Sequence, residues 1–121
     1  MTATEGVTAA AATAPVVHID DIPLAVNSRG VKARQVLDTP PYRVMNLVLE
    51  AGQVIPSHTS PVEVFFYVID GAGEITIDGR VHAVRARDIL PCPKDIPMSV
   101  QAGASGMSFL NVKAPNPATL K

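Results

Sequence analysis

The sequence predicts an all-β domain, either a jelly roll or a small barrel, from three observations. The 11 prolines and 8 glycines are spread through the 121 residues and divide the chain into short segments. Several of these segments are rich in β-branched and aromatic residues, which favour strands. No segment has a convincing helical periodicity. Eight or more short strands joined by glycine and proline turns are typical of these two folds.

The first part of the chain is expected to supply a flexible arm and three strands. Residues 1–15 are rich in Ala and Thr and have no periodicity, which predicts the arm. Pro40 and Pro41 cannot continue a helix, so they mark a bend between two strands. The strands expected here are a short one within Val16 to Val26, then Val31 to Leu37 and Tyr42 to Glu50.

The second part begins with the strongest predicted strand, Val62 to Ile69, which is β-branched and aromatic throughout. Gly71 and Gly73 predict a turn after it, so that Glu74 to Ile77 runs back as a separate strand. Asp78-Gly79 is a hairpin signal that prefers positive φ at both residues. The remaining expected strands are Arg80 to Arg87, Ile89 to Leu90, Met98 to Gln101 and Gly106 to Lys113. The barrel domain is expected over 16–117, with a tail at 118–121.

The composition excludes several classes of function. A formal net charge of -1, with 17% charged and 4% aromatic residues, argues against nucleic-acid binding. No stretch approaches the roughly 18 apolar residues that a membrane span needs. Cys92 is the only cysteine, so no intramolecular disulfide is possible. The first residues lack the Lys or Arg of a signal peptide. A cytoplasmic protein is therefore the expectation.

One segment, Gly52 to Gly71, resembles the first signature of the cupin family. It reads G-QVIPS-HTSPVEVFFYVID-G, where the family has G-x5-H-x-H-x3-4-E-x6-G. Aligned on Pro93, the second signature, G-x5-P-x-G-x2-H-x3-N, places Arg87, Asp95, Met98 and Ala102 at its glycine, glycine, histidine and asparagine. The resemblance implies a small single-domain cupin of the RmlC-like, cupin-2 type, whose fold is a jelly-roll barrel or double-stranded β-helix.

The metal ligands of the family are mostly absent. In metal-binding cupins two His and a Glu of the first signature, and a His of the second, hold one ion. Here His58 takes the first place, and Ser60, Val64 and Met98 take the others. Strand alternation turns Glu63 to the opposite face, unless a bulge at Pro61 shifts it. No cofactor is therefore expected. The alternative is a divalent transition metal held by His58 with Glu63.

Other soft or titratable side chains receive plainer interpretations. Cys92 and Met98 could together favour copper, but a free Cys and a Met are more often core residues. His82 and His18 are expected at the surface. Several polar residues lie on or beside strands, and one or two of them are expected to face the cavity: Tyr42, Arg43, Asn46, Glu50 and Asn111.

Two hypotheses for function follow. In the first, the barrel binds a small, largely apolar molecule without a metal, with His58 and Ser60 as polar anchors and Val64, Phe66 and Met98 as walls. In the second, the chain is a dioxygenase, isomerase or lyase that uses a weakened metal site or His58 as a catalytic acid or base. A purely structural barrel is a third reading. The resemblance also implies a homodimer, in which the strand near Val16 to Val26 pairs across the interface.

Overall fold

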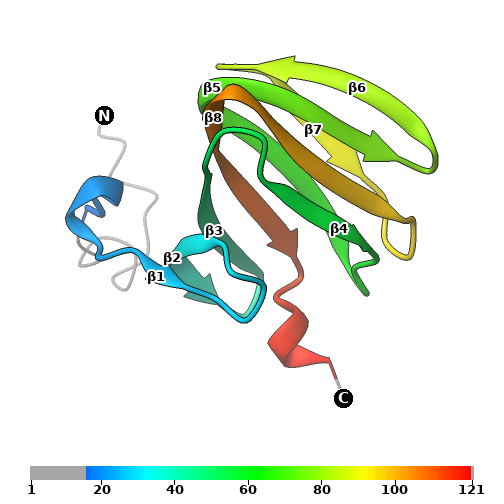
Figure 1. The fold of residues 1–121 in the computed structure, drawn as a ribbon. Coiled ribbons are helices and arrows are strands. Elements are labelled where there is room, and N and C mark those ends of the chain that lie inside the picture. The colour runs from blue at the N-terminus through cyan, green and yellow to red at the C-terminus, as the bar shows by residue number, and fades with distance from the viewer. Residues whose placement is uncertain (1–15, 121) are drawn as a thin grey trace, which may run out of the picture.

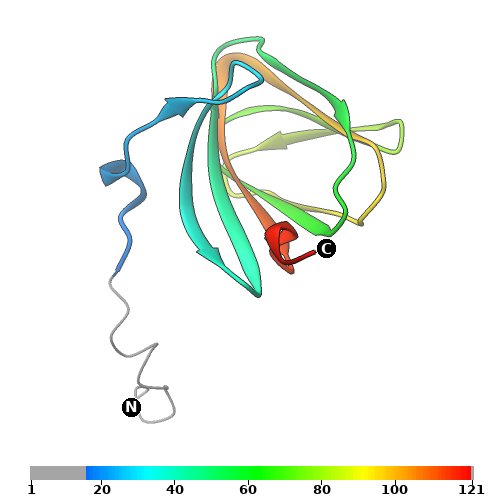
Figure 2. The same ribbon diagram turned by 90° about the horizontal axis from the view of Figure 1, so that it is seen from below.

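Residues 16–120 form eight strands, and all the pairings of these strands are antiparallel. The computed structural model describes residues 16–120, so the arm predicted at residues 1–15 lies outside the described residues. Figures 1 and 2 show the strands wrapped into a barrel. The elements are η2 (Ile19–Asp21), β1 (Ala25–Val26), β2 (Lys32–Thr39), β3 (Tyr42–Leu49), β4 (Val54–His58), β5 (Glu63–Ile77), β6 (Arg80–Arg85), β7 (Ile89–Cys92), β8 (Met98–Ala114) and η3 (Pro117–Thr119).

The strand order explains how the barrel closes. Along the sheet the order is β1-β2-β3-β8-β5-β6, while β4 pairs with the first part of β8 and β7 pairs with β5. The two longest strands, β5 and β8, therefore have partners on both sides. As Figure 2 shows, β2 and β3 lie on one side of the barrel and β4 lies across from them. The all-β prediction is confirmed.

Two predicted strand breaks are wrong. The segments on either side of Gly71 and Gly73 form one strand, β5, and those around Gly106 form one strand, β8. Gly71 pairs with Met107, between two register shifts. A Cβ atom on Gly71 would lie 2.2 Å from the carbonyl oxygen of Gly106. These glycines therefore allow two backbones to approach closely within a bent strand, and they do not reverse the chain.

The predicted short strand within Val16 to Val26 is present as Ala25–Val26, and the 3-10 turn η2 precedes it. At the other end η3 occupies part of the predicted tail, because the Asn116 side chain accepts a hydrogen bond from the Ala118 N–H at 3.0 Å. The Asp78-Gly79 hairpin is confirmed, with φ of 52° and 78°.

The barrel interior is apolar and tightly packed. Side chains alternate along β5, so that Val64, Phe66 and Val68 are buried while Glu63 and Phe65 are exposed. The predicted alternation at this point is confirmed. Phe66 packs edge-to-face on Phe109 of β8, with the ring centroids 5.7 Å apart. This pair joins the two longest strands at the centre of the core.

A polar network on the outer face of the sheet fixes the first described segment. Asn46 is fully buried; its amide donates to the Phe109 carbonyl and the Ser108 hydroxyl, each at 3.0 Å. Its oxygen accepts from Arg34 Nε at 2.9 Å, and Arg34 Nη1 donates to the Ile22 carbonyl at 2.9 Å. The network therefore ties the segment around Ile22 to β2, β3 and β8. Asn46, one of the residues considered for the cavity, faces away from it.

Candidate functional site

A cavity of about 430 Å³ lies inside the barrel and is lined by residues of β2, β3, β4, β5 and β8 and the loop before β2. Paired strands arrange many of these residues in levels, because every second residue of a strand faces inward. Ala33, Leu47 and Phe109 are cross-strand neighbours at one level, and Arg43 faces Lys113 two levels away. Between them lie Gln35, Met45, Asn111 and Phe66, in that order across four strands.

The level that contains Ala33, Leu47 and Phe109 is apolar. We call this part of the cavity the floor, and it is completed by Ile55 and Val100, which pair across β4 and β8. Its members are Val31, Ala33, Leu47, Ile55, Val100 and Phe109, of which all but Leu47 are less than 9% exposed. The floor thus presents hydrocarbon surface from five different chain segments.

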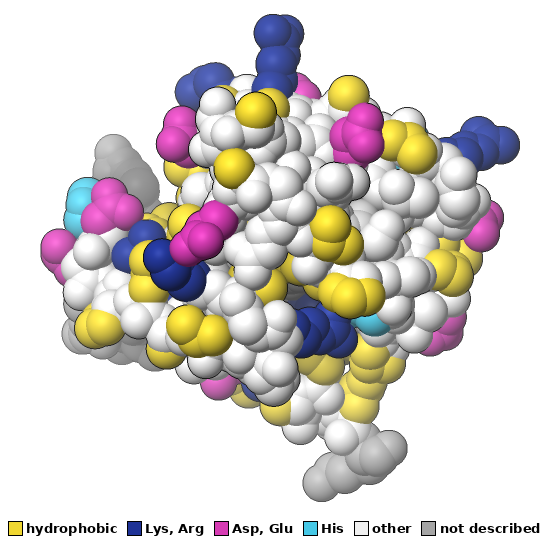
Figure 3. All heavy atoms as spheres, in the orientation of Figure 1, with side chains coloured by type: hydrophobic (Ala, Val, Ile, Leu, Met, Phe, Trp, Pro, Cys, Tyr) yellow, Lys and Arg dark blue, Asp and Glu magenta, His cyan; other side chains and the backbone are white. Residues whose placement is uncertain are grey.

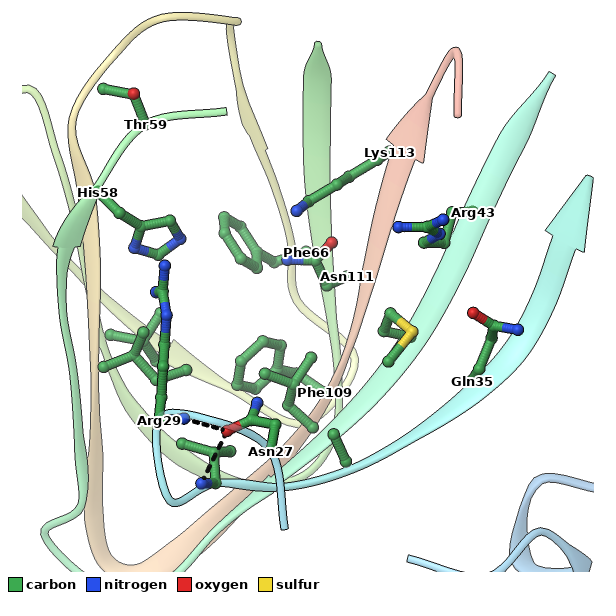
Figure 4. A pocket seen from close by; sticks show the side chains of 16 residues that line it. Asn27, Arg29, Gln35, Arg43, His58, Thr59, Phe66, Phe109, Asn111 and Lys113 are labelled. Carbon is green, nitrogen blue, oxygen red and sulfur yellow. Dashed lines mark hydrogen bonds between the residues drawn. The ribbon is translucent and has the colours of Figure 1, made fainter. Parts of the chain in front are cut away.

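The opposite end of the cavity is cationic. We call it the rim; it consists of Arg29, Arg43, His58 and Lys113. In Figure 4 the Lys113 amino group points into the cavity from β8, and Arg29 reaches up from its loop toward the His58 ring. No Asp or Glu is among the residues that line the cavity. In the space-filling view, Lys or Arg side chains lie beside a His in a hollow of the surface (Figure 3).

The rim cations are close enough to perturb one another. Burial lowers the pKa of Lys113, and the positive charges of Arg43 and Arg29 lower it further. Arg43 has a counterion outside the cavity, since its Nε lies 3.2 Å from Asp38 Oδ1. Among residues 16–120, neither Arg29 nor Lys113 forms an ion pair. The rim therefore holds two cations without a carboxylate partner.

Asp38 is itself held in place from the end of the chain. The Asn116 amide donates to its carboxylate and to the Thr39 carbonyl, and Asn116 is buried. Hydrogen bonds from Asn116 and then Arg43 lower the pKa of Asp38, so its carboxylate stays ionised. The turn between β2 and β3 and the segment after β8 are thereby joined beside the rim, and Arg43 is fixed between Asp38 and the cavity.

His58 is oriented by the backbone. Its Nδ1 lies 2.9 Å from the Pro56 carbonyl oxygen. Because a carbonyl only accepts hydrogen bonds, Nδ1 carries the proton and, in the neutral ring, Nε2 is the free acceptor. Burial lowers the pKa of His58; the bond to Pro56 opposes this, and the charges of Arg29 and Lys113 lower the pKa further. The ring is therefore mostly neutral near pH 7.

Only part of the predicted site lies at the cavity. His58 and Phe66 line it, but Ser60, Val64 and Met98 do not. The Ser60 hydroxyl turns back into its own loop, donating to the Val62 carbonyl at 2.8 Å. Val64 and Met98 belong to the closed core, at 3% and 1% exposure. Asn111 and Arg43, two of the polar residues considered from the sequence, do line the cavity.

The donor set does not fit the metal that the cupin resemblance implies. Glu63, the proposed second ligand, is exposed and accepts a hydrogen bond from the Lys94 N–H at 3.1 Å. Within 16–120 there is no group of three His, Cys, Asp or Glu residues that could hold an ion. Cys92 and Met98 do not fit a copper site either. Burial and the charge of Glu63 raise the pKa of Cys92, which disfavours the thiolate that binds metals. The thiol points to the Pro93 and Ile96 carbonyls.

Sequence reasoning missed Arg29, Gln35 and Lys113. Lys113 did have a signal, since it shares the inward parity of Phe109 and Asn111 on one strand. Arg29 lies in a turn, where alternation says nothing about direction. Its position depends on the Asn27 side chain, which accepts hydrogen bonds from the Arg29 and Val31 backbone N–H groups at 2.9 and 3.1 Å. His18 is exposed and His82 half-buried, and both lie outside the cavity.

Comparison with known proteins gives a consistent picture of the fold. A family model described as a cupin domain matches residues 45–112. Among solved structures, KdgF from Halomonas sp. superposes with a TM-score of 0.78 at 17% identity, covering 85% of this chain and 94% of that one. An RmlC-like cupin from Shewanella frigidimarina gives 0.76 at 14% identity, with 85% and 92% covered. These likenesses confirm the predicted jelly-roll barrel.

A larger enzyme shares the fold over part of its length. Salicylate 1,2-dioxygenase from Pseudoaminobacter salicylatoxidans, solved with gentisate, superposes with a TM-score of 0.68 at 20% identity, covering 82% of this chain and 28% of that one. No curated protein matches this chain. In the part of the chain that the structure describes, no helix is long and apolar enough to cross a membrane.

Proposed function

We propose that this chain, which belongs to the cupin family, binds a small organic anion in the cavity of its barrel. The observation that carries the proposal is the rim: Arg29, Arg43 and Lys113 surround one cavity whose lining includes no carboxylate. Like charges on neighbouring strands destabilise a sheet when nothing neutralises them. A bound anion would supply the missing charge and accept hydrogen bonds from the free donors of Arg29 and Lys113.

The ligand expected from the sequence was a largely apolar molecule, and the rim changes that expectation. A neutral hydrocarbon would leave the half-buried Lys113 without a partner, which is costly. The apolar walls remain suited to the uncharged part of a ligand. An organic carboxylate satisfies both ends of the cavity, so it is the ligand that the proposal names.

The proposal is tested by calorimetric titration with benzoate and with benzamide, which have similar shapes but different charge. We expect benzoate to bind at least about tenfold more tightly, because hydrogen bonds to charged groups are the stronger ones. Raising the ionic strength should weaken benzoate binding. Equal affinity for the two compounds, or no binding of benzoate, would contradict the proposal.

Variants of the rim supply the matched comparison. Lys113→Met removes the cation at similar length, and we expect it to weaken benzoate binding about tenfold or more. The control is Lys94→Met, because Lys94 is exposed and lies outside the cavity. If both variants bind benzoate as the unaltered protein does, the rim is not the anion site.

A second candidate function is an enzyme that acts on the bound anion with His58 as base. The observation that favours it is the orientation of His58, whose Nδ1–H is bound to Pro56 and whose Nε2 is free at the cavity. A neutral imidazole beside Arg29 and Lys113 can accept a proton from a substrate held by those cations.

Proton exchange tests this second candidate. The protein is incubated in deuterium oxide with pyruvate, whose methyl protons are acidic, and deuterium uptake is followed by mass spectrometry. Faster exchange with the unaltered protein than with His58→Gln supports a base at this position. Equal exchange by both proteins rejects it for this substrate class. The predicted homodimer and cytoplasmic location stay predictions, the first of them measurable by light scattering.

A further inference from the structure

The two ends of the cavity have opposite chemical character, and this polarity constrains the ligand beyond its charge. The rim contributes four basic side chains, and the floor contributes six apolar ones. The levels of paired residues fix their separation, because two residues along an antiparallel strand span about 7 Å. Arg43 and Leu47 are four residues apart on β3, so the rim and the floor are separated by about 14 Å along the strand.

We propose that the site selects amphipathic monocarboxylates, with the carboxylate at the rim and an extended apolar body reaching toward the floor. This inference rests on the proposed function, since it assumes that an anion binds at the rim. Compact anions, such as acetate or the dianion oxalate, would fill the rim and leave the apolar floor without a contact. An alkyl or aryl body would cover Phe66 and the floor residues.

The middle level supports the same direction of binding. Met45 and Phe66 continue the apolar surface upward from the floor, and Gln35 and Asn111 stand beside them. The floor in turn excludes the reversed orientation, because that orientation would bury a carboxylate against Phe109 and Val100, which are 0% and 2% exposed. The head of the ligand is thus assigned to Arg29 and Lys113.

The test is an affinity series with acetate, butanoate, hexanoate and octanoate, measured by calorimetry on the full chain. Each methylene that is buried should tighten binding by up to about fourfold. Octanamide should bind at least about tenfold more weakly than octanoate. Affinity that is flat along the series, or oxalate that binds more tightly than octanoate, would overturn the inference. If no carboxylate in the series binds, the proposed function itself fails.

A floor variant locates the apolar body. Ala33→Leu fills part of the floor, and we expect it to reduce octanoate affinity about tenfold while changing acetate affinity less than about twofold. The matched control is Ala83→Leu on β6, where the side chain is exposed and outside the cavity. Octanoate affinity that Ala33→Leu leaves unchanged would overturn the orientation. If this variant does not fold, the chain-length series on the unaltered protein still decides the question.

Discussion

Single residues at the rim carry a cost in the free protein that an anion would relieve. Arg43 and Lys113 face each other on neighbouring strands, and Lys113 has no carboxylate partner among the described residues. The arrangement therefore has opposite expected effects on the affinity for an anion and on the stability of the ligand-free protein. A residue that strengthens binding weakens the fold when the ligand is absent.

Lys113→Met should accordingly stabilise the ligand-free protein at pH 7, by about 0.5 kcal/mol, because it removes a like-charge cross-strand pair. The lowered pKa of Lys113 gives the sign: folding disfavours its charged form. The gain should shrink as the pH rises toward 10.5, the unfolded value, where the lysine loses its charge. Urea unfolding at several pH values measures it. Destabilisation at pH 7 that Lys94→Met does not share would contradict the prediction.

The pKa of His58 predicts a second pH dependence. Folding lowers this pKa below its ordinary value of 6.5, so the unfolded chain takes up a proton first as the pH falls. Stability should therefore decrease below pH 6.5, until the folded ring is also protonated. His58→Gln should flatten this part of the profile, as measured by thermal unfolding. His82→Gln is the control for loss of an imidazole outside the cavity, and an identical effect of both changes would refute the assignment.

Asn46 and Asn111 are two asparagines in different surroundings, the first in a buried hydrogen-bond network and the second at the cavity. Asn46 is fully buried, and its replacement by Leu removes its hydrogen bonds to the Phe109 carbonyl and to Arg34 Nε. We expect Asn46→Leu to cost roughly 2–3 kcal/mol in unfolding free energy. Asn111→Leu, on the cavity surface, should cost less than about 1 kcal/mol, because the Asn111 side chain makes no hydrogen bond within 16–120. Chemical denaturation compares them, and equal costs would contradict this.

At the level of elements, the glycines of β5 decide how the barrel bends. Gly71 and Gly79 both have positive φ, at 79° and 78°, but their surroundings differ. A Cβ on Gly71 meets the Gly106 carbonyl, whereas nothing lies within 4 Å of a Cβ on Gly79. Comparing the two positions therefore isolates the effect of close backbone approach from the effect of φ.

Gly79→Ala should cost about 1–2 kcal/mol, which is the strain of the left-handed conformation alone. Gly71→Ala should cost at least about 2 kcal/mol more, because the clash with Gly106 must displace a strand as well. Thermal unfolding of the two variants measures the difference. Equal melting temperatures would show that β5 and β8 can separate at this point without loss.

The same glycines show where prediction from sequence ended. Most of the strands other than β4 were predicted at nearly the right places, because β-branched and aromatic residues between Gly and Pro mark them. The error at Gly71 and Gly73 arose because a glycine that turns the chain and one that admits a second backbone look alike in sequence. For Gly71 the distinction depends on Gly106, which is 35 residues away along the chain, and for Gly73 it depends on Gln101.

At the level of the whole molecule, the site was predicted less well than the fold. Alternation along β5 correctly separated Phe66 from Glu63, since both belong to one regular strand. The rim as a whole was not predicted, although His58 and Arg43 were candidates, because it is assembled from a turn, the end of β4, β3 and β8, and no local pattern links those segments. The cupin signatures correctly placed His58 at the cavity. They also predicted Ser60, Val64 and Met98 as site residues, because these residues occupy the positions of metal ligands in the family.

The continuity of β5 and β8 has one more consequence. β5 and β8 pair with each other from end to end, and Phe66 of β5 packs against Phe109 of β8. Opening the barrel between these two strands would break the backbone hydrogen bonds that pair them. Entry of a ligand would therefore depend on side chains at the rim, such as Arg29 and Lys113, and not on separation of the two long strands.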